Sequence, residues 1–300
     1  MSRIAGLILV LAAGGALACD GTRRNPPIPG PPNSGSAATV VLGEAKIDVT
    51  LILREKDRRH AVPRLAPPDQ RQGYLLAWPR ERFMKIESEG ARAAFDVVFL
   101  DKSGGVVDVQ PLKAFDPEGV MPKSPAAYAL LLAPGLPRKL GVKPGDKAGF
   151  SAEVENAKPE ELPVIRINGI PAYVELALDE AERSHGLMFR PRMSEEDGML
   201  FAYPDEGGRS FWMKNTLIPL DIAFFAADGT LLNVNETPMY PDPRNPGPNH
   251  ATSSSQGPAR FVLEMNLGWF KRKGITDGSG RVAPGTKAEI PPEALKGTFE

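Results

Sequence analysis

The sequence predicts a mostly β protein of two tandem compact β-sandwich or barrel domains, each with one or two short helices. Three observations lead to this prediction. The 300 residues include 30 glycines and 31 prolines, well above the usual share of these turn-forming residues. Apolar and polar residues alternate in short runs, as in half-buried strands. A gap-free internal repeat divides the chain into two similar halves.

The amino terminus has the pattern of a bacterial lipoprotein signal peptide over residues 1–18. Arg3 precedes an apolar run from Ile4 to Leu17, which at ~1.5 Å per residue is too short to cross a bilayer. Small residues before Cys19 resemble a lipobox, and this resemblance implies cleavage before Cys19 and its lipidation. The alternative is an ordinary secretory signal with an incidental cysteine. Residues 19–38 are rich in Pro, Gly and Ser and predict a tether.

The amino-terminal pattern predicts where the protein lies in the cell and that it binds a membrane. We expect the protein to lie in the cell envelope, bound to a membrane through its lipid anchor. The folded part would then face the periplasm or the cell exterior.

The repeat fixes the predicted domain boundaries. Shifting the chain by 125 residues superimposes Val49–Val109 on Val174–Val234 with 15 identities in 61 positions. The match resumes at a shift of 133, so the second copy carries an insertion of eight residues within Pro238–Gln256. We therefore predict a first β domain at 39–150, a linker at 151–163 and a second β domain at 164–294.

Turn signals and alternation define the elements of the second copy in order. Asn168-Gly169 predicts a hairpin within 164–178, and Asp179 is placed to cap a short helix at 180–186. Strands are predicted at 199–203, 209–213, 220–225, 231–234 and 260–265, with a short helix at 267–273. The acidic residues 195–197 are expected in a solvated loop.

Composition excludes several classes of function. A net charge of -1 gives no reason to expect nucleic acid as a partner. One cysteine excludes an intramolecular disulfide and a multi-cysteine metal site, and three histidines leave little for a metal centre. We predict no metal and no cofactor. His60 and His185 are equivalent positions before turns, and they are more typical of structural or exposed histidines than of catalytic ones.

The second copy carries a set of motifs that together resemble one family. They are Gly186–Arg190, Gly198–Phe201, Phe211–Ile222, Val262–Asn266 and Gly268-Trp269. In this order they resemble the family named domain of unknown function 192, over about residues 164–290. The resemblance implies a compact, mostly β domain, often exported, and no established activity. The first copy resembles a diverged member, with Ile86–Gly90 in place of Phe211–Asn215.

The motif residues with functional side chains are the candidate ligand-binding groove. They are Arg190, Trp212, Met213, Lys214, Asn215, Thr216, Asp221 and Glu264. Trp212 offers a stacking face, and the charged residues could hold a polar ligand or pair with one another. Alternatively, Phe211 and Met213 pack inward, Trp212 and Lys214 lie outside, and Asn215-Thr216 only turns the chain.

One candidate, Asp221, lies among apolar residues and therefore needs a partner. Arg190 is a plausible one. The counterpart of Asp221 in the first copy is Asp96, which favours an architectural role for this carboxylate.

Three functions remain open at this point. The leading hypothesis is a lipid-anchored, non-enzymatic binding or accessory module with an envelope polymer or protein as partner. The alternatives are a carbohydrate-active or other hydrolase that uses Asp221 and Glu264 as a carboxylate pair, and a purely structural envelope protein. No catalytic residues are predicted in the leading hypothesis.

Overall fold

The computed structural model describes residues 38–239, 252–277 and 279–296. The predicted signal peptide, Cys19 and the tether up to residue 37 lie outside the described residues, as does part of the predicted insertion loop. Within the described ranges, no helix has the length and apolar character needed to span a membrane.

The first domain is one curled sheet of seven strands in the order β5-β4-β6-β3-β2-β1-β7. The strands are β1 (Ala38–Leu42), β2 (Ala45–Ile52), β3 (Gln72–Arg82), β4 (Phe95–Leu100), β5 (Val106–Leu112), β6 (Ala126–Leu132) and β7 (Ala148–Phe150). Strands β2 and β3 are parallel, because α1 (Glu55–Arg59) and the 3-10 helix η1 (Val62–Arg64) carry the chain back between them. The helix α2 (Leu136–Lys139) follows β6.

The second domain repeats this order as β13-β12-β15-β10-β9-β8-β16. Its strands are β8 (Val164–Ile167), β9 (Ile170–Ala177), β10 (Asp197–Gly207), β12 (Leu220–Phe225), β13 (Leu231–Thr237), β15 (Ala259–Asn266) and β16 (Ala288–Glu289). Two further strands, β11 (Ser210–Trp212) and β14 (Thr252–Ser254), form a separate two-stranded ribbon. Its helices are α4 (Glu180–His185), α5 (Trp269–Arg272) and α6 (Pro292–Leu295).

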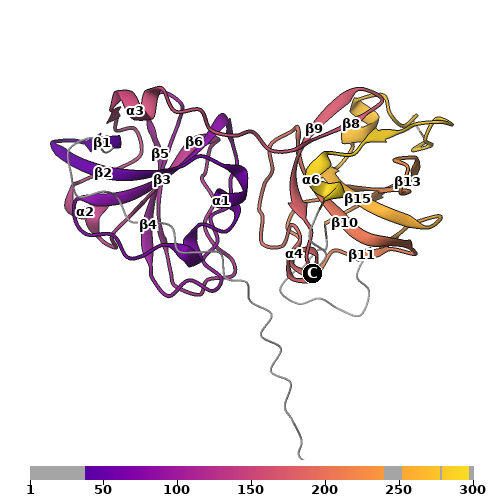
Figure 1. The fold of residues 1–300 in the computed structure, drawn as a ribbon, viewed down its shortest axis with the longest axis horizontal. Helices are drawn as coiled ribbons and strands as arrows, with labels where there is room; N and C mark the ends of the chain where they lie inside the picture. The colour runs from indigo at the N-terminus through magenta and orange to yellow at the C-terminus, as the bar shows by residue number, and fades with distance from the viewer. Residues whose placement is uncertain (1–37, 240–251, 278, 297–300) are drawn as a thin grey trace, which may run out of the picture.

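Strand register confirms the duplication residue by residue. Val97 pairs with Leu131 in the first sheet, and Ile222 pairs with Glu264 in the second. These positions are related by the shifts of 125 and 133 found in the sequence. The prediction of two tandem, mostly β domains is therefore confirmed, and Figure 1 shows them side by side.

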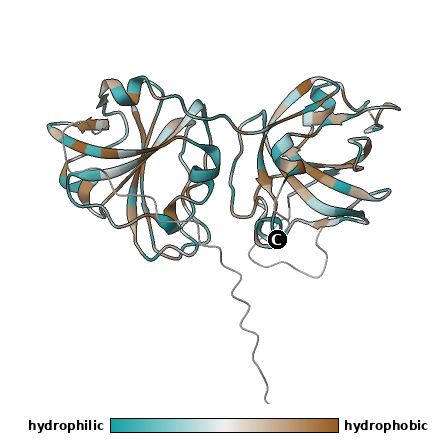
Figure 2. Ribbon diagram, in the orientation of Figure 1, coloured by the Kyte–Doolittle hydropathy of each residue, from teal (hydrophilic) through white to brown (hydrophobic). Residues whose placement is uncertain are grey.

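Each sheet packs an apolar cluster on both of its faces. In the second domain, Leu263 and Met265 belong to one cluster, whereas Val262 and Phe224 belong to the other. Figure 2 shows apolar residues along the strands and hydrophilic residues in the short helices. This two-sided burial leaves little room for a charged side chain, so charges inside the sheets need an explanation.

The predicted linker begins as part of the first domain. Its first residues form α3 (Ala152–Glu155), whose Val154 is buried in the core of the first domain. Further along, Glu161 accepts a hydrogen bond of 2.6 Å from Arg80 Nε, and the Arg80 guanidinium lies 3.6 Å from the Tyr173 ring centroid. Pro163, the last residue of the predicted linker, accepts a hydrogen bond of 2.8 Å from the Val174 N–H of the second domain, so the linker lies against both domains.

Candidate functional site

The tryptophan-containing motif divides into an inward and an outward face. Phe211 packs edge-on against Phe201, with ring centroids 4.9 Å apart, and Met213 is fully buried. Trp212 is 51% exposed, and Lys214 Nζ lies 5.1 Å from its ring centroid. The chain alternates here because β11 pairs with β14 as an extended strand. Trp212 and Lys214 therefore lie on the outward face of this segment, together with the exposed Ser210.

Asn215 and Thr216 form a turn that holds the neighbouring motif. Asn215 has a positive φ of 54°, and its carbonyl accepts a hydrogen bond of 2.8 Å from the Phe189 backbone N–H. Thr216 is buried, and its hydroxyl donates to the Lys214 carbonyl at 3.3 Å. These contacts match the structural alternative for both residues.

Arg190 forms a buried, bidentate ion pair with a residue that the sequence analysis did not single out. Its two terminal nitrogens lie 2.7 and 2.6 Å from the carboxylate oxygens of Glu175 on β9. Arg190 is 5% exposed. The corresponding residues of the first copy are Leu65 and Thr50, so this ion pair belongs to the second domain alone.

Glu264 lies on the same face of the sheet as Glu175. Both residues pair in register with Met199 of β10, one from each side. Burial raises the pKa of Glu264 to about 8, and the nearby positive charge of Arg190 only partly opposes this shift. Its counterpart in the first copy is Leu131. Glu264 is therefore a mostly protonated acid at neutral pH in a position that the first copy fills with an apolar side chain.

Asp221 lies on the opposite face of the sheet and caps a helix. It pairs with Met265, whereas Glu264 pairs with its neighbour Ile222. Its oxygens accept hydrogen bonds from the backbone N–H groups of Gly268 at 2.8 Å and Phe270 at 3.1 Å, at the start of α5. Asp96 makes the same contact in the first domain, with Gly135 N–H at 2.8 Å.

Two expectations about Asp221 are therefore wrong. Its partners are backbone amides and not Arg190. Because side chains of successive strand residues point to opposite faces, Asp221 and Glu264 are separated by the sheet. They cannot act on one substrate as a carboxylate pair, and the hydrolase alternative built on them fails.

The interface between the domains uses the part of the first copy that had lost the motif. Glu87 occupies the position of Trp212, and its carboxylate lies 2.9 Å from Lys85 Nζ and 3.3 Å from His185 Nε2 of the second domain. Burial alone would raise the pKa of Glu87, but the hydrogen bond with His185 and the charge of Lys85 outweigh it and lower the pKa to about 2. A second contact between the domains joins His60 to Glu182 at 3.2 Å.

The acidic segment 195–197 was expected to be solvated, and for Asp197 this is wrong. Asp197 is 1% exposed and lies 3.0 Å from Arg82 of the first domain. Glu196 pairs with Lys273 at 2.5 Å. The roles of these acids, and of Glu87 and Glu175, were missed because each has a partner from a segment distant in sequence: Arg82 for Asp197, Lys273 for Glu196, His185 for Glu87 and Arg190 for Glu175. The sequence signal that could have indicated these residues is a difference between the two copies at an equivalent position, such as Glu87 in the first copy where the second copy has Trp212.

Among the predicted site residues, Arg190 lines two pockets between the domains. They are a partly open cavity of about 100 Å³ and a cleft of about 610 Å³, both with walls from the two domains. Trp212 and Asn215 line neither. Within the described ranges, no group of three or more His, Cys, Asp or Glu residues is placed to hold a metal ion.

A family model matches both copies of the repeat. The model of the family domain of unknown function 192 (DUF192), described as "Uncharacterized ACR", matches residues 43–150 and again 164–281. A solved structure from Sinorhizobium meliloti 1021, described as a "putative transcription regulator", is 34% identical over 45% of this chain and 98% of that chain, with a TM-score of 0.36. A protein of unknown function from Novosphingobium aromaticivorans DSM 12444 is 31% identical over 47% and 99%, with a TM-score of 0.36. No match was found among curated proteins.

Proposed function

This chain belongs to the DUF192 family through both of its domains, and on that premise we propose that it is a lipid-anchored, non-enzymatic binding protein of the cell envelope. In this proposal Cys19 carries the lipid, residues 19–38 span the distance from the membrane, and the second domain binds a partner outside the cytoplasm. The first domain supports the second through their shared interface.

The observation that carries the binding role is the exposed indole of Trp212. It is 51% exposed although the residues on either side of it, Phe211 and Met213, pack inward. The first copy has Glu87 at this position, and Glu87 is engaged by Lys85 and His185. At this motif position, therefore, the second domain exposes an indole where the first domain has an ion-paired carboxylate.

The surroundings of Trp212 favour an envelope glycan as the partner. The flat indole offers an apolar face to the C–H face of a sugar ring, and Lys214 adds a charged donor beside it. The hydroxyls of Ser210 and Ser254 lie 3.2 Å apart on the same ribbon, where they can bond sugar hydroxyls.

Binding is tested by co-sedimentation of the chain, carrying Cys19→Ser so that it is not lipidated, with purified cell-wall glycan. We expect Trp212→Ala to reduce the bound fraction at least tenfold. The matched control is Phe115→Ala, which removes another exposed aromatic ring, 63% exposed, from the first domain. Equal binding by all variants, or none by the parent, would refute the Trp212 surface. Binding only to protein-containing envelope fractions would replace the glycan with a protein partner.

The anchor has its own test. Cells expressing the native chain should incorporate labelled fatty acid into it, and Cys19→Ala should abolish the label and release the protein from membranes. The proposed anchor would be contradicted if the Cys19→Ala variant still incorporated the labelled fatty acid, whether or not it was released from membranes.

A further inference from the structure

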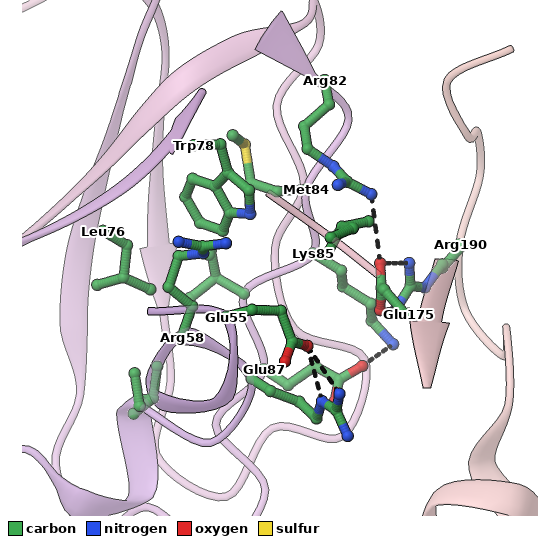
Figure 3. A pocket seen from close by; sticks show the side chains of 15 residues that line it. Glu55, Arg58, Leu76, Trp78, Arg82, Met84, Lys85, Glu87, Glu175 and Arg190 are labelled. Atoms are coloured by element: carbon green, nitrogen blue, oxygen red, sulfur yellow. Dashed lines mark hydrogen bonds and ion pairs between the residues drawn. The ribbon is translucent and has the colours of Figure 1, made fainter. Parts of the chain in front are cut away.

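A cavity of about 100 Å³ lies where the two domains meet, and most of its wall comes from the first domain. Leu76, Trp78, Met84 and Ile86 form an apolar side, and Glu175 and Arg190 of the second domain close the other. Figure 3 shows these side chains around the cavity, with Arg82 and Arg190 approaching Glu175 from different directions. This site is separate from the Trp212 surface.

The cavity exists because two aromatic residues of the second domain are aliphatic in the first. Phe201 and Phe211 pack edge-on at 4.9 Å and fill the equivalent region of the second domain. Their counterparts are Leu76 and Ile86, and both line the cavity. The first copy therefore has smaller side chains than the second at these two positions, one of which, Ile86, belongs to the segment that replaces the tryptophan-containing motif.

Arg58 is a buried cation at this cavity, and its guanidinium bonds backbone carbonyls. It is 7% exposed, and its guanidinium lies 5.3 Å from the Trp78 ring centroid. It donates to the carbonyl oxygens of Leu53 and Glu160. Within the described ranges it forms no ion pair, whereas the other four cations of the lining each have a carboxylate within 4 Å.

Three guanidinium nitrogens at the same cavity lack a hydrogen-bond acceptor. They are Arg58 Nε, Arg82 Nη1 and Arg190 Nε, and they account for three of the four such buried atoms in the part of the chain that is described. The three residues are 7%, 3% and 5% exposed. An unsatisfied buried donor costs roughly 1–3 kcal/mol, so three donors around one cavity indicate an acceptor inside it.

The electrostatics point to an anion as that acceptor. Burial lowers the pKa of Arg58 to about 10, and the positive charge of Arg82 contributes to the shift although Glu55 opposes it. Arg58 and Arg82 therefore repel each other across a region of low polarity. A single negative charge between them would relieve this repulsion and satisfy both donors.

We propose that the cavity binds a short monocarboxylate. Its carboxylate bonds Arg58 Nε and Arg82 Nη1, and its hydrocarbon body packs against Trp78, Met84 and Leu76. A volume of about 100 Å³ has room for roughly seven to ten water molecules, which suits an acid of about three to five carbons. The apolar wall distinguishes such a ligand from phosphate or sulfate, which have no apolar surface to bury.

Isothermal titration calorimetry on the chain with Cys19→Ser tests this proposal with a series from acetate to octanoate. We expect affinity to rise with chain length to about five carbons and to fall at least tenfold by octanoate. Butyramide, the neutral isostere of butanoate, should bind at least tenfold more weakly than butanoate. Phosphate or sulfate binding as tightly as butanoate would overturn the ligand class.

Two variants locate the site. Arg82→Gln should weaken butanoate binding at least tenfold. Leu76→Phe restores the aromatic residue of the second copy and should abolish binding while the domain stays folded by circular dichroism. The matched control is Arg183→Gln, which changes the counterpart of Arg58 away from this cavity and should leave binding within twofold. Butanoate binding that survives Leu76→Phe, or no saturable binding by the parent, would mean that the cavity holds water only.

Discussion

The buried carboxyl of Glu264 makes the stability of the second domain depend on pH in an unusual direction. Its ordinary pKa of 4.5 applies to the unfolded chain, and burial raises the pKa to about 8 in the folded domain. The folded state therefore binds a proton that the unfolded state has released. The free energy of unfolding contributed by this group is fully present below pH 4.5 and is lost as the pH rises toward 8.

The magnitude follows from the two pKa values. A difference from 4.5 to about 8 corresponds to roughly 5 kcal/mol over the whole range, at about 1.4 kcal/mol per pH unit. Between pH 5 and pH 7 the loss should be roughly 2 to 3 kcal/mol. Glu264→Gln keeps the shape of the side chain and cannot ionise, so the variant should gain this amount relative to the parent over the same interval.

Urea unfolding at several pH values measures this difference. In a Trp78→Phe background, the fully buried Trp269 reports on the second domain. Glu289→Gln, which neutralises an exposed carboxylate of the same sheet, is the control and should follow the parent. If the Glu264→Gln and parent curves stay parallel from pH 5 to 7, the carboxyl is ionised in the folded domain and the reasoning is wrong.

Three further predictions concern the shared architecture. Asp221→Ala should destabilise the second domain by about 1–3 kcal/mol, because two backbone N–H groups lose their acceptor; hydrogen exchange should speed up at α5 and stay unchanged at α2. Gly198→Ala should destabilise more than Gly73→Ala in thermal unfolding, because a Cβ at 198 would come closer to Met265 Sδ and the Glu264 carbonyl oxygen than a Cβ at 73 would come to Leu132 and the Leu131 carbonyl oxygen; equal effects would contradict this. Glu87→Gln should speed proteolysis of the linker 151–163 at pH 7. In the parent, the contribution of the ionised Glu87 to the stability of the interface is present above pH 4.5 and is lost as the pH falls toward about 2. Linker cleavage that does not change at low pH would therefore argue against the Glu87–His185 contact.

Sequence patterns were sufficient for the features that depend on neighbouring residues. The Asn168-Gly169 turn joins β8 and β9 as expected, and Asp179 caps α4 with a complete capping box. The duplication was also readable, because turn glycines and apolar residues stay in phase over 61 positions. The parallel pairing of β9 with β10 was not predicted, since α4 between them left no local signal of direction.

The site was less predictable because its partners are distant in sequence. Arg190 was singled out, but its partner Glu175 lies 15 residues away on another strand, and no spacing rule relates the two. An arginine was expected as the partner of Asp221, but backbone N–H groups at the start of α5 donate hydrogen bonds to its carboxylate. The cavity at Arg58 results from side-chain volume lost at Leu76 and Ile86, and only a residue-by-residue comparison of the two packed copies shows that loss.

The common strand order has a consequence for how the chain folds. Two adjacent sheets with the same register could exchange strands while both are incomplete, a failure typical of tandem repeats. Here the copies share only 15 of 61 aligned residues. The positions of Glu175 and Glu264 in the second copy are occupied by the uncharged Thr50 and Leu131 in the first copy. A strand inserted into the wrong sheet would bury an unpaired carboxylate, so sequence divergence keeps each half of the polypeptide folding with itself.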